Sequence, residues 1–209
     1  MRTRSILSLS LALAASAGAT PTIQVELGAS HFWLRNTHGE DNVDPLRVDE
    51  PTKTAPFVAA TYAFNQRFGL RLSYHYLDNV ETAAEFGHPP GEVVPQVVVL
   101  GRFRDDVHVV SLAPEFNWNL TPRLKFAIAP QVNWVASRGV VSYATNDPSV
   151  LLVGPRERDA DGFTLAGSTR LIWALGERAA VSLGYHYIDF DPSFGRTAQV
   201  LSGGLLWTF

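Results

Sequence analysis

Two histidines in matching motifs are the first candidates for chemistry in this chain. His75 stands in Tyr-His-Tyr-Leu-Asp at residues 74–78, and His186 stands in Tyr-His-Tyr-Ile-Asp at residues 185–189. A histidine pair can bind a metal ion or relay a proton when further ligands support it. The sequence offers no carboxylate at the height of these two histidines, and hydrogen bonds to neighbours would satisfy both rings. We therefore predict no metal site and no cofactor.

A serine beside one of these histidines raises the question of catalysis. Ser73 and His75 share one strand and one face, but no acid follows them at hydrogen-bonding reach. The chain has no Gly-x-Ser-x-Gly motif, which positions the serine of many hydrolases. It also has no cysteine, which excludes disulfides, thiolate metal sites and cysteine nucleophiles. We predict no catalytic residues and no enzyme.

The composition narrows the class of protein. Hydrophobic residues make up 46% of the 209 residues and charged residues 18%, which suits one folded domain. The formal net charge is −3, with 17 basic and 20 acidic residues. This balance argues against a nucleic-acid partner, because nucleic-acid-binding domains carry clustered basic residues.

Residues 1–19 have the three parts of a signal peptide. Arg2 and Arg4 give a positive start, residues 6–15 are apolar, and Ala17-Gly18-Ala19 supplies a cleavage site. The apolar run is too short for a transmembrane helix. We predict a signal peptide at residues 1–19 and one domain at residues 20–209.

Alternation of apolar and polar residues dominates that domain. A period of two indicates β-strands with one buried or lipid-facing side. Segments of roughly ten to fourteen residues match the length of a tilted membrane-spanning strand. The eight segments are residues 22–35, 54–64, 67–77, 107–118, 123–135, 162–174, 179–188 and 197–209. The predicted fold is all-β, an eight-stranded antiparallel up-and-down transmembrane β-barrel.

The connections alternate between short and long. Short turns follow the second, fourth and sixth segments, whereas residues 36–53, 78–106, 136–161 and 189–196 are longer and more polar. Outer-membrane barrels have short periplasmic turns and long extracellular loops, so both termini are expected on the periplasmic side. Residues 93–104 are rich in β-branched residues, and we interpret them as part of a long extracellular hairpin rather than as a ninth spanning strand.

Charged residues recur on the polar face at similar depth. Because a lipid-facing Arg or Lys near the midplane costs about 2–4 kcal/mol, these groups are expected inside the barrel. We predict one layer in the periplasmic third of the lumen, in which two carboxylates pair with three cations. It consists of Glu26, Arg71, Glu115, Lys125 and Arg170. Since side chains can fill an eight-stranded barrel, the layer would be a polar plug, with an ion path as the alternative.

The C-terminal strand carries the most specific pattern. Residues 201–209 read Leu-Ser-Gly-Gly-Leu-Leu-Trp-Thr-Phe and resemble the assembly signal of small outer-membrane barrels, with Trp207 and the terminal Phe209. With the signal peptide and the eight alternating segments, residues 20–209 resemble the family typified by the transmembrane domain of outer-membrane protein A. The resemblance implies a bacterial outer-membrane location and delivery by the barrel assembly machinery. The peptidoglycan-binding domain of larger relatives is not expected here.

Membership of such a family does not fix a function. We expect a structural or surface-loop interaction role in the envelope, with outer-membrane lipids and lipopolysaccharide as neighbours, and a monomer. A narrow channel for ions or small solutes is the first alternative, and a lipid-modifying enzyme is the second.

Overall fold

All eight alternating segments form strands of one antiparallel sheet. The computed structural model describes residues 21–36, 47–48, 52–86, 99–145, 154–191 and 196–209, so the predicted signal peptide lies outside the described residues. The strands are β1 (Thr22–Asn36), β2 (Arg47–Val48), β3 (Thr52–Ala63), β4 (Phe68–Phe86), β5 (Val99–Asn119), β6 (Leu124–Thr145), β7 (Arg156–Ala174), β8 (Ala179–Asp191) and β9 (Arg196–Thr208).

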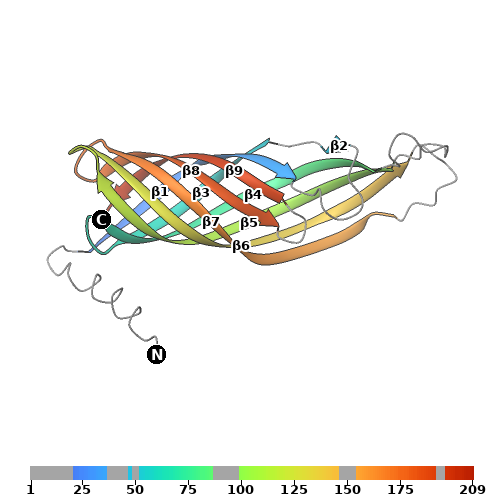
Figure 1. Ribbon diagram of the computed structural model, residues 1–209, viewed down its shortest axis with the longest axis horizontal. Coiled ribbons are helices and arrows are strands. Elements are labelled where there is room, and N and C mark those ends of the chain that lie inside the picture. Colours follow the sequence, from blue (N-terminus) through green and yellow to red (C-terminus); the bar gives the residue numbers. More distant parts are fainter. Residues whose placement is uncertain (1–20, 37–46, 49–51, 87–98, 146–153, 192–195) are drawn as a thin grey trace, which may run out of the picture.

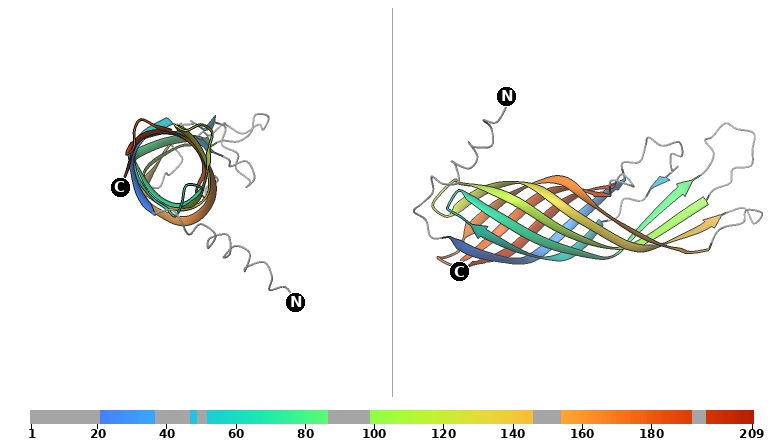
Figure 2. Two further views of the ribbon diagram at one scale, coloured as in Figure 1. Left: turned by 90° about the vertical axis from the view of Figure 1, so that its left-hand side faces the viewer. Right: turned by 90° about the horizontal axis from the view of Figure 1, so that it is seen from below.

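The sheet closes into a ring of eight strands. The order is β1-β3-β4-β5-β6-β7-β8-β9, and β9 pairs again with β1 from Gln24↔Thr208 to Asn36↔Arg196. Seen along its axis, the ring is complete (Figure 2). The two-residue β2 lies outside it and pairs with the far end of β4. The predicted eight-stranded antiparallel barrel is thus confirmed.

Side chains tie down the tight turns at one end of the ring. Asn65 Oδ1 accepts hydrogen bonds from the backbone N–H groups of Arg67 (2.8 Å) and Phe68 (2.9 Å) in the β3–β4 turn. Thr121 Oγ1 accepts from Leu124 N at 3.0 Å in the β5–β6 turn. Such local bonds are the reason why Asn and Thr favour turns. β1 begins and β9 ends at this same short-turn end (Figure 1).

At the opposite end, strands β4 to β7 run far beyond the ring. β5 and β6 have 21 and 22 residues, whereas a tilted strand needs about 9–11 to cross a membrane. The ladders continue to Phe86↔Val99 and Val99↔Thr145. These strand ends form a sheet that projects past β8, β9 and β1 (Figures 1 and 2). We name this part the projecting sheet; it comprises residues 81–86 of β4, 99–106 of β5, 136–145 of β6 and 156–161 of β7.

The projecting sheet corrects part of the sequence prediction. Residues 78–106 and 136–161 were expected as loops, and this was wrong for the strand residues named above. The interpretation of residues 93–104 as hairpin holds from Val99 onward, since Val99 to Arg104 pair with Phe86 to Glu81; residues 93–98 lie outside the described part. Where β4 leaves the ring, a bulge lies between Leu77 and Val80, and Asn79 takes φ 54°. Asn is among the few residues that adopt this left-handed conformation readily.

Along one edge of the projecting sheet, the structure describes no neighbouring strand. The β7–β8 ladder starts at Gly167↔Tyr187, so residues 156–166 of β7 pair only with β6. The β4 edge, in contrast, carries β2 through Arg47↔Glu85 and Val48↔Ala84. The β3–β4 ladder ends at Phe57↔His75, so residues 76–83 of β4 also have no described partner strand on that side, and the two edges differ in that β2 covers the far end of the β4 edge.

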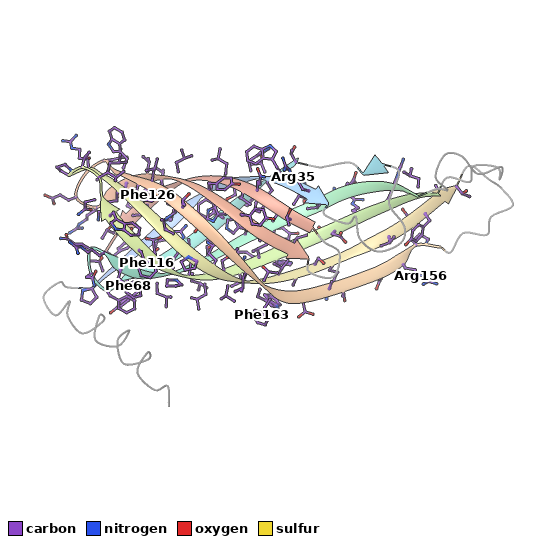
Figure 3. All side chains as sticks on the ribbon, in the orientation of Figure 1. Arg35, Phe68, Phe116, Phe126, Arg156 and Phe163 are labelled. Carbon is purple, nitrogen blue, oxygen red and sulfur yellow. The ribbon has the colours of Figure 1, made fainter. Side chains whose placement is uncertain are left out.

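The outer surface of the ring is apolar, as the alternation predicts. Leucines, valines and aromatics of one parity point outward from every strand of the ring (Figure 3). Tryptophans lie towards both ends of the band, at Trp118, Trp173 and Trp207 on the short-turn side and at Trp33 and Trp134 on the other. An apolar band with aromatic girdles is the surface that barrels present to lipid. No helix among the described residues is long and apolar enough to cross a membrane.

Candidate functional site

Four of the predicted charged residues meet inside the barrel. Arg71 on β4 donates to Glu26 on β1 at 2.7 Å. Arg170 on β7 donates through Nη1 to Glu26 and through Nη2 to Glu115 on β5, the latter at 2.7 Å. Ser182 on β8 donates to the other oxygen of Glu26. All these side chains are almost completely buried, so the chain of ion pairs braces five strands across the lumen.

Pairing is what allows charges to be buried at this depth. An unpaired buried carboxylate or guanidinium would be very costly, whereas here two cations alternate with two anions. We name the group Arg71, Glu26, Arg170 and Glu115 the ion-pair chain. Sequence reasoning missed Ser182, although its position on the inward face of β8 was visible in the alternation.

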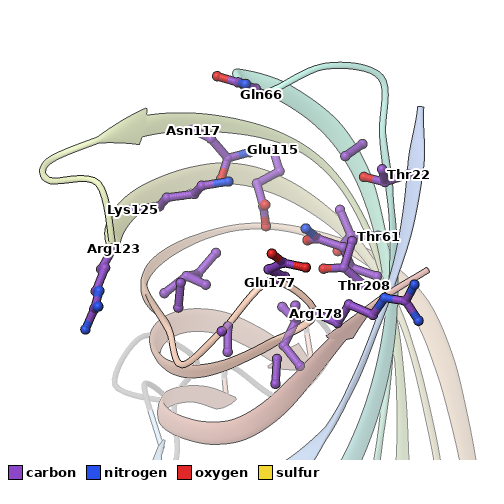
Figure 4. Close-up of a pocket in the computed structure, with 18 of the residues that line it drawn as sticks. Thr22, Thr61, Gln66, Glu115, Asn117, Arg123, Lys125, Glu177, Arg178 and Thr208 are labelled. Atoms are coloured by element: carbon purple, nitrogen blue, oxygen red, sulfur yellow. The ribbon is translucent and has the colours of Figure 1, made fainter. Parts of the chain in front are cut away.

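Lys125, the fifth predicted residue, lies apart from the ion-pair chain. It is half-buried near the start of β6 and forms no ion pair with any described residue. Its side chain lines a cavity at the short-turn end (Figure 4). The structure thus joins four members of the predicted layer and leaves Lys125 outside it.

The two motif histidines also meet, farther from the short-turn end. The ring centroids of His75 and His186 are 6.1 Å apart, with an angle of 76° between the ring planes. His75 stacks on Phe57 at 5.3 Å, and His186 contacts Ser202 (Nε2 to Oγ, 3.0 Å) and Gln131 (Nδ1 to Nε2, 3.4 Å). Both rings are buried.

This environment suits packing better than ligand binding. Among the described residues there is no group of three His, Asp or Glu side chains that could hold a metal ion. The ring of Phe57 stacks on one side of His75, and the ring of Phe32 makes an edge contact with it, with 5.7 Å between the ring centroids. The histidine pair therefore fills the middle of the lumen between the ion-pair chain and the side chains above it.

An apolar cluster closes the remaining half of the lumen, and sequence reasoning missed it. We name it the apolar seal. Its members are Phe32, Leu34, Ala55, Leu77, Val80, Val107, Val109, Val135, Ile188, Ala198 and Val200. None is more than 6% exposed, so this level is packed like the core of a water-soluble protein.

A signal for the apolar seal was present in the sequence. Near the long-connection end the inward parity itself becomes apolar, as in Phe32-Trp33-Leu34, where Trp33 faces outward and its two neighbours face inward. A strand that is apolar on both faces is buried on both faces. From the short-turn end outward, the lumen is therefore filled in order by the ion-pair chain, the histidine pair and the apolar seal.

The short-turn end remains open as a cavity of about 430 Å³. Residues of the three tight turns and the adjoining strand ends line it, and Glu115 and Thr61 stand at its inner end (Figure 4). Ile172, Ala180 and Leu206 form a small apolar patch in its wall. The cavity does not continue through the barrel, because the filled levels lie beyond it.

The residues of the predicted assembly signal lie on the outer surface. Trp207 and Phe209 are 41% and 78% exposed on the apolar face of the last strand. The backbone N–H of Phe209 donates to Ile23 O at 2.8 Å, which ties the chain end to β1 at the closing seam. Recognition of these residues by assembly machinery stays a prediction.

Comparisons with known proteins give the fold. No protein-family model and no curated protein matches the chain. Three similar solved structures are Neisserial surface protein A (13% identity, TM-score 0.58), OprG from Pseudomonas aeruginosa (12%, 0.56) and Ail of Yersinia pestis (12%, 0.53). Each comparison covers 91% of this chain, and 100%, 96% and 100% of the other chains respectively.

The likeness extends over the whole ring and rests on fold alone at these identities. All three solved proteins are described as bacterial surface or outer-membrane proteins. Together with the outward-facing apolar band and its aromatic girdles, the shared fold identifies the chain as a small eight-stranded β-barrel of the bacterial outer membrane.

Proposed function

We propose that this protein is a non-conducting outer-membrane barrel that anchors the projecting sheet and presents it outside the cell. The proposal is supported by two features in combination: the lumen is filled, and strands β4 to β7 continue beyond the ring. A barrel with a filled lumen is a rigid support, and the interacting part is then the projecting sheet.

The lumen supports the anchoring role. The ion-pair chain and the apolar seal close it at two separate levels. Opening a path would require breaking buried ion pairs and also wetting a packed apolar cluster. The first of these alone is expensive, because each separated charge stays buried. We therefore expect no conductance.

The projecting sheet supports the interaction role. Its residues 156–161 on β7 have no partner strand on one side among the described residues, and such an edge can accept an extended segment of another protein as an added strand. Glu157, Asp159 and Asp161 share one face of this edge and are exposed. Charged edge residues disfavour uncontrolled aggregation. An extended partner segment with basic residues at alternate positions would fit this face.

Conductance measurement tests the closed lumen. Protein purified in detergent is inserted into planar bilayers, and single-channel current is recorded for the wild type and for Lys125→Ala. The proposal expects no stable openings in either protein. Reproducible openings that change in Lys125→Ala would refute it and favour the channel alternative.

Single-cysteine labelling tests which end is outside. Because the chain has no cysteine, each introduced thiol is unique. Glu157→Cys in the projecting sheet should react with a membrane-impermeant maleimide on intact cells. Glu177→Cys in the β7–β8 turn is the matched control and should react only after the outer membrane is permeabilised. The opposite pattern would contradict the proposed orientation.

A lipid-modifying activity remains the alternative from a different class. Ser73 and His75 are both buried inside the barrel, and His75 is covered by Phe57 and Phe32. A lipid in the bilayer faces the opposite parity of the same strand. We expect the lipid A profile, measured by mass spectrometry, to be identical in cells that produce the wild type or His75→Ala. A lipid A change that depends on His75 would establish an enzyme.

A further inference from the structure

The cavity at the short-turn end has the properties of a binding pocket. Its volume of about 430 Å³ falls in the range of small-molecule sites, which is roughly 300–1,000 Å³. It is a blind pocket, since the ion-pair chain closes its inner end. Its open end faces the periplasm in the orientation proposed above.

The charges that line the pocket favour an anion. Three cationic side chains line it, Arg123, Lys125 and Arg178, against two acidic ones, Glu115 and Glu177. Glu115 is already bound by Arg170 from the lumen side at 2.7 Å. The cations therefore exceed the acidic charge that is still free to pair with them.

Lys125 is the cation placed deepest among these three. It is half-buried, whereas Arg123 and Arg178 are exposed on two different turns at the rim. Figure 4 shows Lys125 beside Asn117, and the β5–β6 register makes them diagonal neighbours on the same inward face. An ammonium group and a side-chain amide next to each other offer several donors to one oxyanion.

The inner end of the pocket adds a further polar group. Thr61 lines the cavity and is 2% exposed, and its Oγ1 has no hydrogen-bond partner among the described residues. A buried hydroxyl without a partner costs free energy, so a ligand that reaches it gains a hydrogen bond.

Backbone hydrogen bonds hold the rim of the pocket in place. Ala174 N donates to Arg123 O and Thr208 N donates to Arg178 O, both at 2.8 Å. Each of these turns is thereby tied to the next strand of the ring. A site whose walls are already ordered loses less entropy when a ligand binds.

We propose that this pocket binds a small oxyanion from the periplasm, a molecule with a phosphate or carboxylate head group, and that Lys125 is its principal ligand. The side chains of Asn117 and Thr61 donate further hydrogen bonds, and Arg123 and Arg178 attract the anion at the rim. This site is separate from the projecting sheet, so it can be present whatever the outer end of the barrel binds.

Calorimetric titration tests the proposal on the full-length protein purified from outer membranes in detergent. Inorganic phosphate and citrate are titrated separately, which distinguishes a phosphate from a carboxylate preference. We expect one equivalent to bind, with affinity reduced at least about tenfold in Lys125→Gln and largely retained in Lys125→Arg. Arg102→Gln, which removes the same charge from an exposed position in the projecting sheet, is the matched control and should bind like the wild type.

The outcomes separate clearly. Saturable binding of either anion that is lost only in Lys125→Gln supports the site and fixes the head group. Absence of saturable binding of both anions up to about 10 mM, or equal binding by wild type and Lys125→Gln, overturns it. Electrophoresis without heating, in which folded and unfolded barrels migrate differently, verifies that each variant is folded.

Discussion

Removal of Arg170 should strongly destabilise this barrel. Arg170 joins Glu26 and Glu115, which come from two other strands. Arg170→Met keeps a long side chain of similar shape but removes both ion pairs. Glu26 would still be bound by Arg71 at 2.7 Å, while Glu115 would lose its cation and remain buried.

The loss of stability follows from the one carboxylate, Glu115, that is left buried without a cation. Breaking a buried ion pair by removing one partner lowers the free energy of unfolding by about 3–5 kcal/mol. The exposed pair Arg138–Asp159 is the matched control on neighbouring strands, with N···O 3.1 Å and side chains 84% and 68% exposed. Arg138→Met should cost less than about 1 kcal/mol, because solvent screens exposed pairs.

Reversible urea unfolding in lipid vesicles measures both effects. The chain has five tryptophans, whose fluorescence reports the transition. The double variant Arg170→Met/Glu115→Gln also removes the unpaired charge of Glu115, so it should be more stable than Arg170→Met alone. If Arg170→Met costs no more than Arg138→Met, or if the double variant recovers nothing, the ion-pair chain does not stabilise the barrel as argued.

Three further changes probe other levels of the structure. A Cβ on Gly28 would lie 2.2 Å from Gly203 O, so Gly28→Ala should prevent closure of β1 on β9, whereas Gly167→Ala, whose Cβ meets nothing within 4 Å, should fold normally. Unheated electrophoresis compares the two, and equal folded yields would contradict the close approach. Phe32→Ala opens a cavity in the apolar seal and should cost about 3–5 kcal/mol in the urea assay; a loss below about 1 kcal/mol would mean that the seal is loosely packed. Deletion of Phe209, which is 78% exposed, should slow membrane insertion in pulse-chase experiments and leave the urea midpoint of refolded protein nearly unchanged, and normal insertion would argue against an assembly signal.

The ring was predictable from the sequence because lipid imposes a strict alternation on it. The projecting sheet was not, because strands outside the membrane do not need an apolar face towards lipid. There the backbone hydrogen bonds between strands continue, as in Gly101↔Tyr143. The residues on neither side of the sheet have to be apolar, so the sequence of these segments resembles that of polar loops.

The lumen was predictable only in part, for a geometric reason. The prediction grouped Lys125, near the start of its strand, in one layer with Arg170, although it lies closer to the short-turn end. The register pairs Lys125 with Ile172, two residues nearer the short-turn end than Arg170. Most inward-facing residues are polar, so the inward side of every strand was expected to be polar along its whole length. In the apolar seal the inward-facing residues are apolar instead.

The apolar seal has a consequence for the route by which the protein reaches its membrane. Where the seal meets β1 and β6, apolar residues occupy both parities in succession, as in Phe32-Trp33-Leu34 and Trp134-Val135-Ala136. Before insertion the unfolded chain must cross the aqueous periplasm, and short runs rich in aromatic and branched residues are the segments that aggregate there. We therefore expect the export of this barrel, with its apolar filling, to depend more on holding chaperones than the export of a barrel whose lumen is polar throughout.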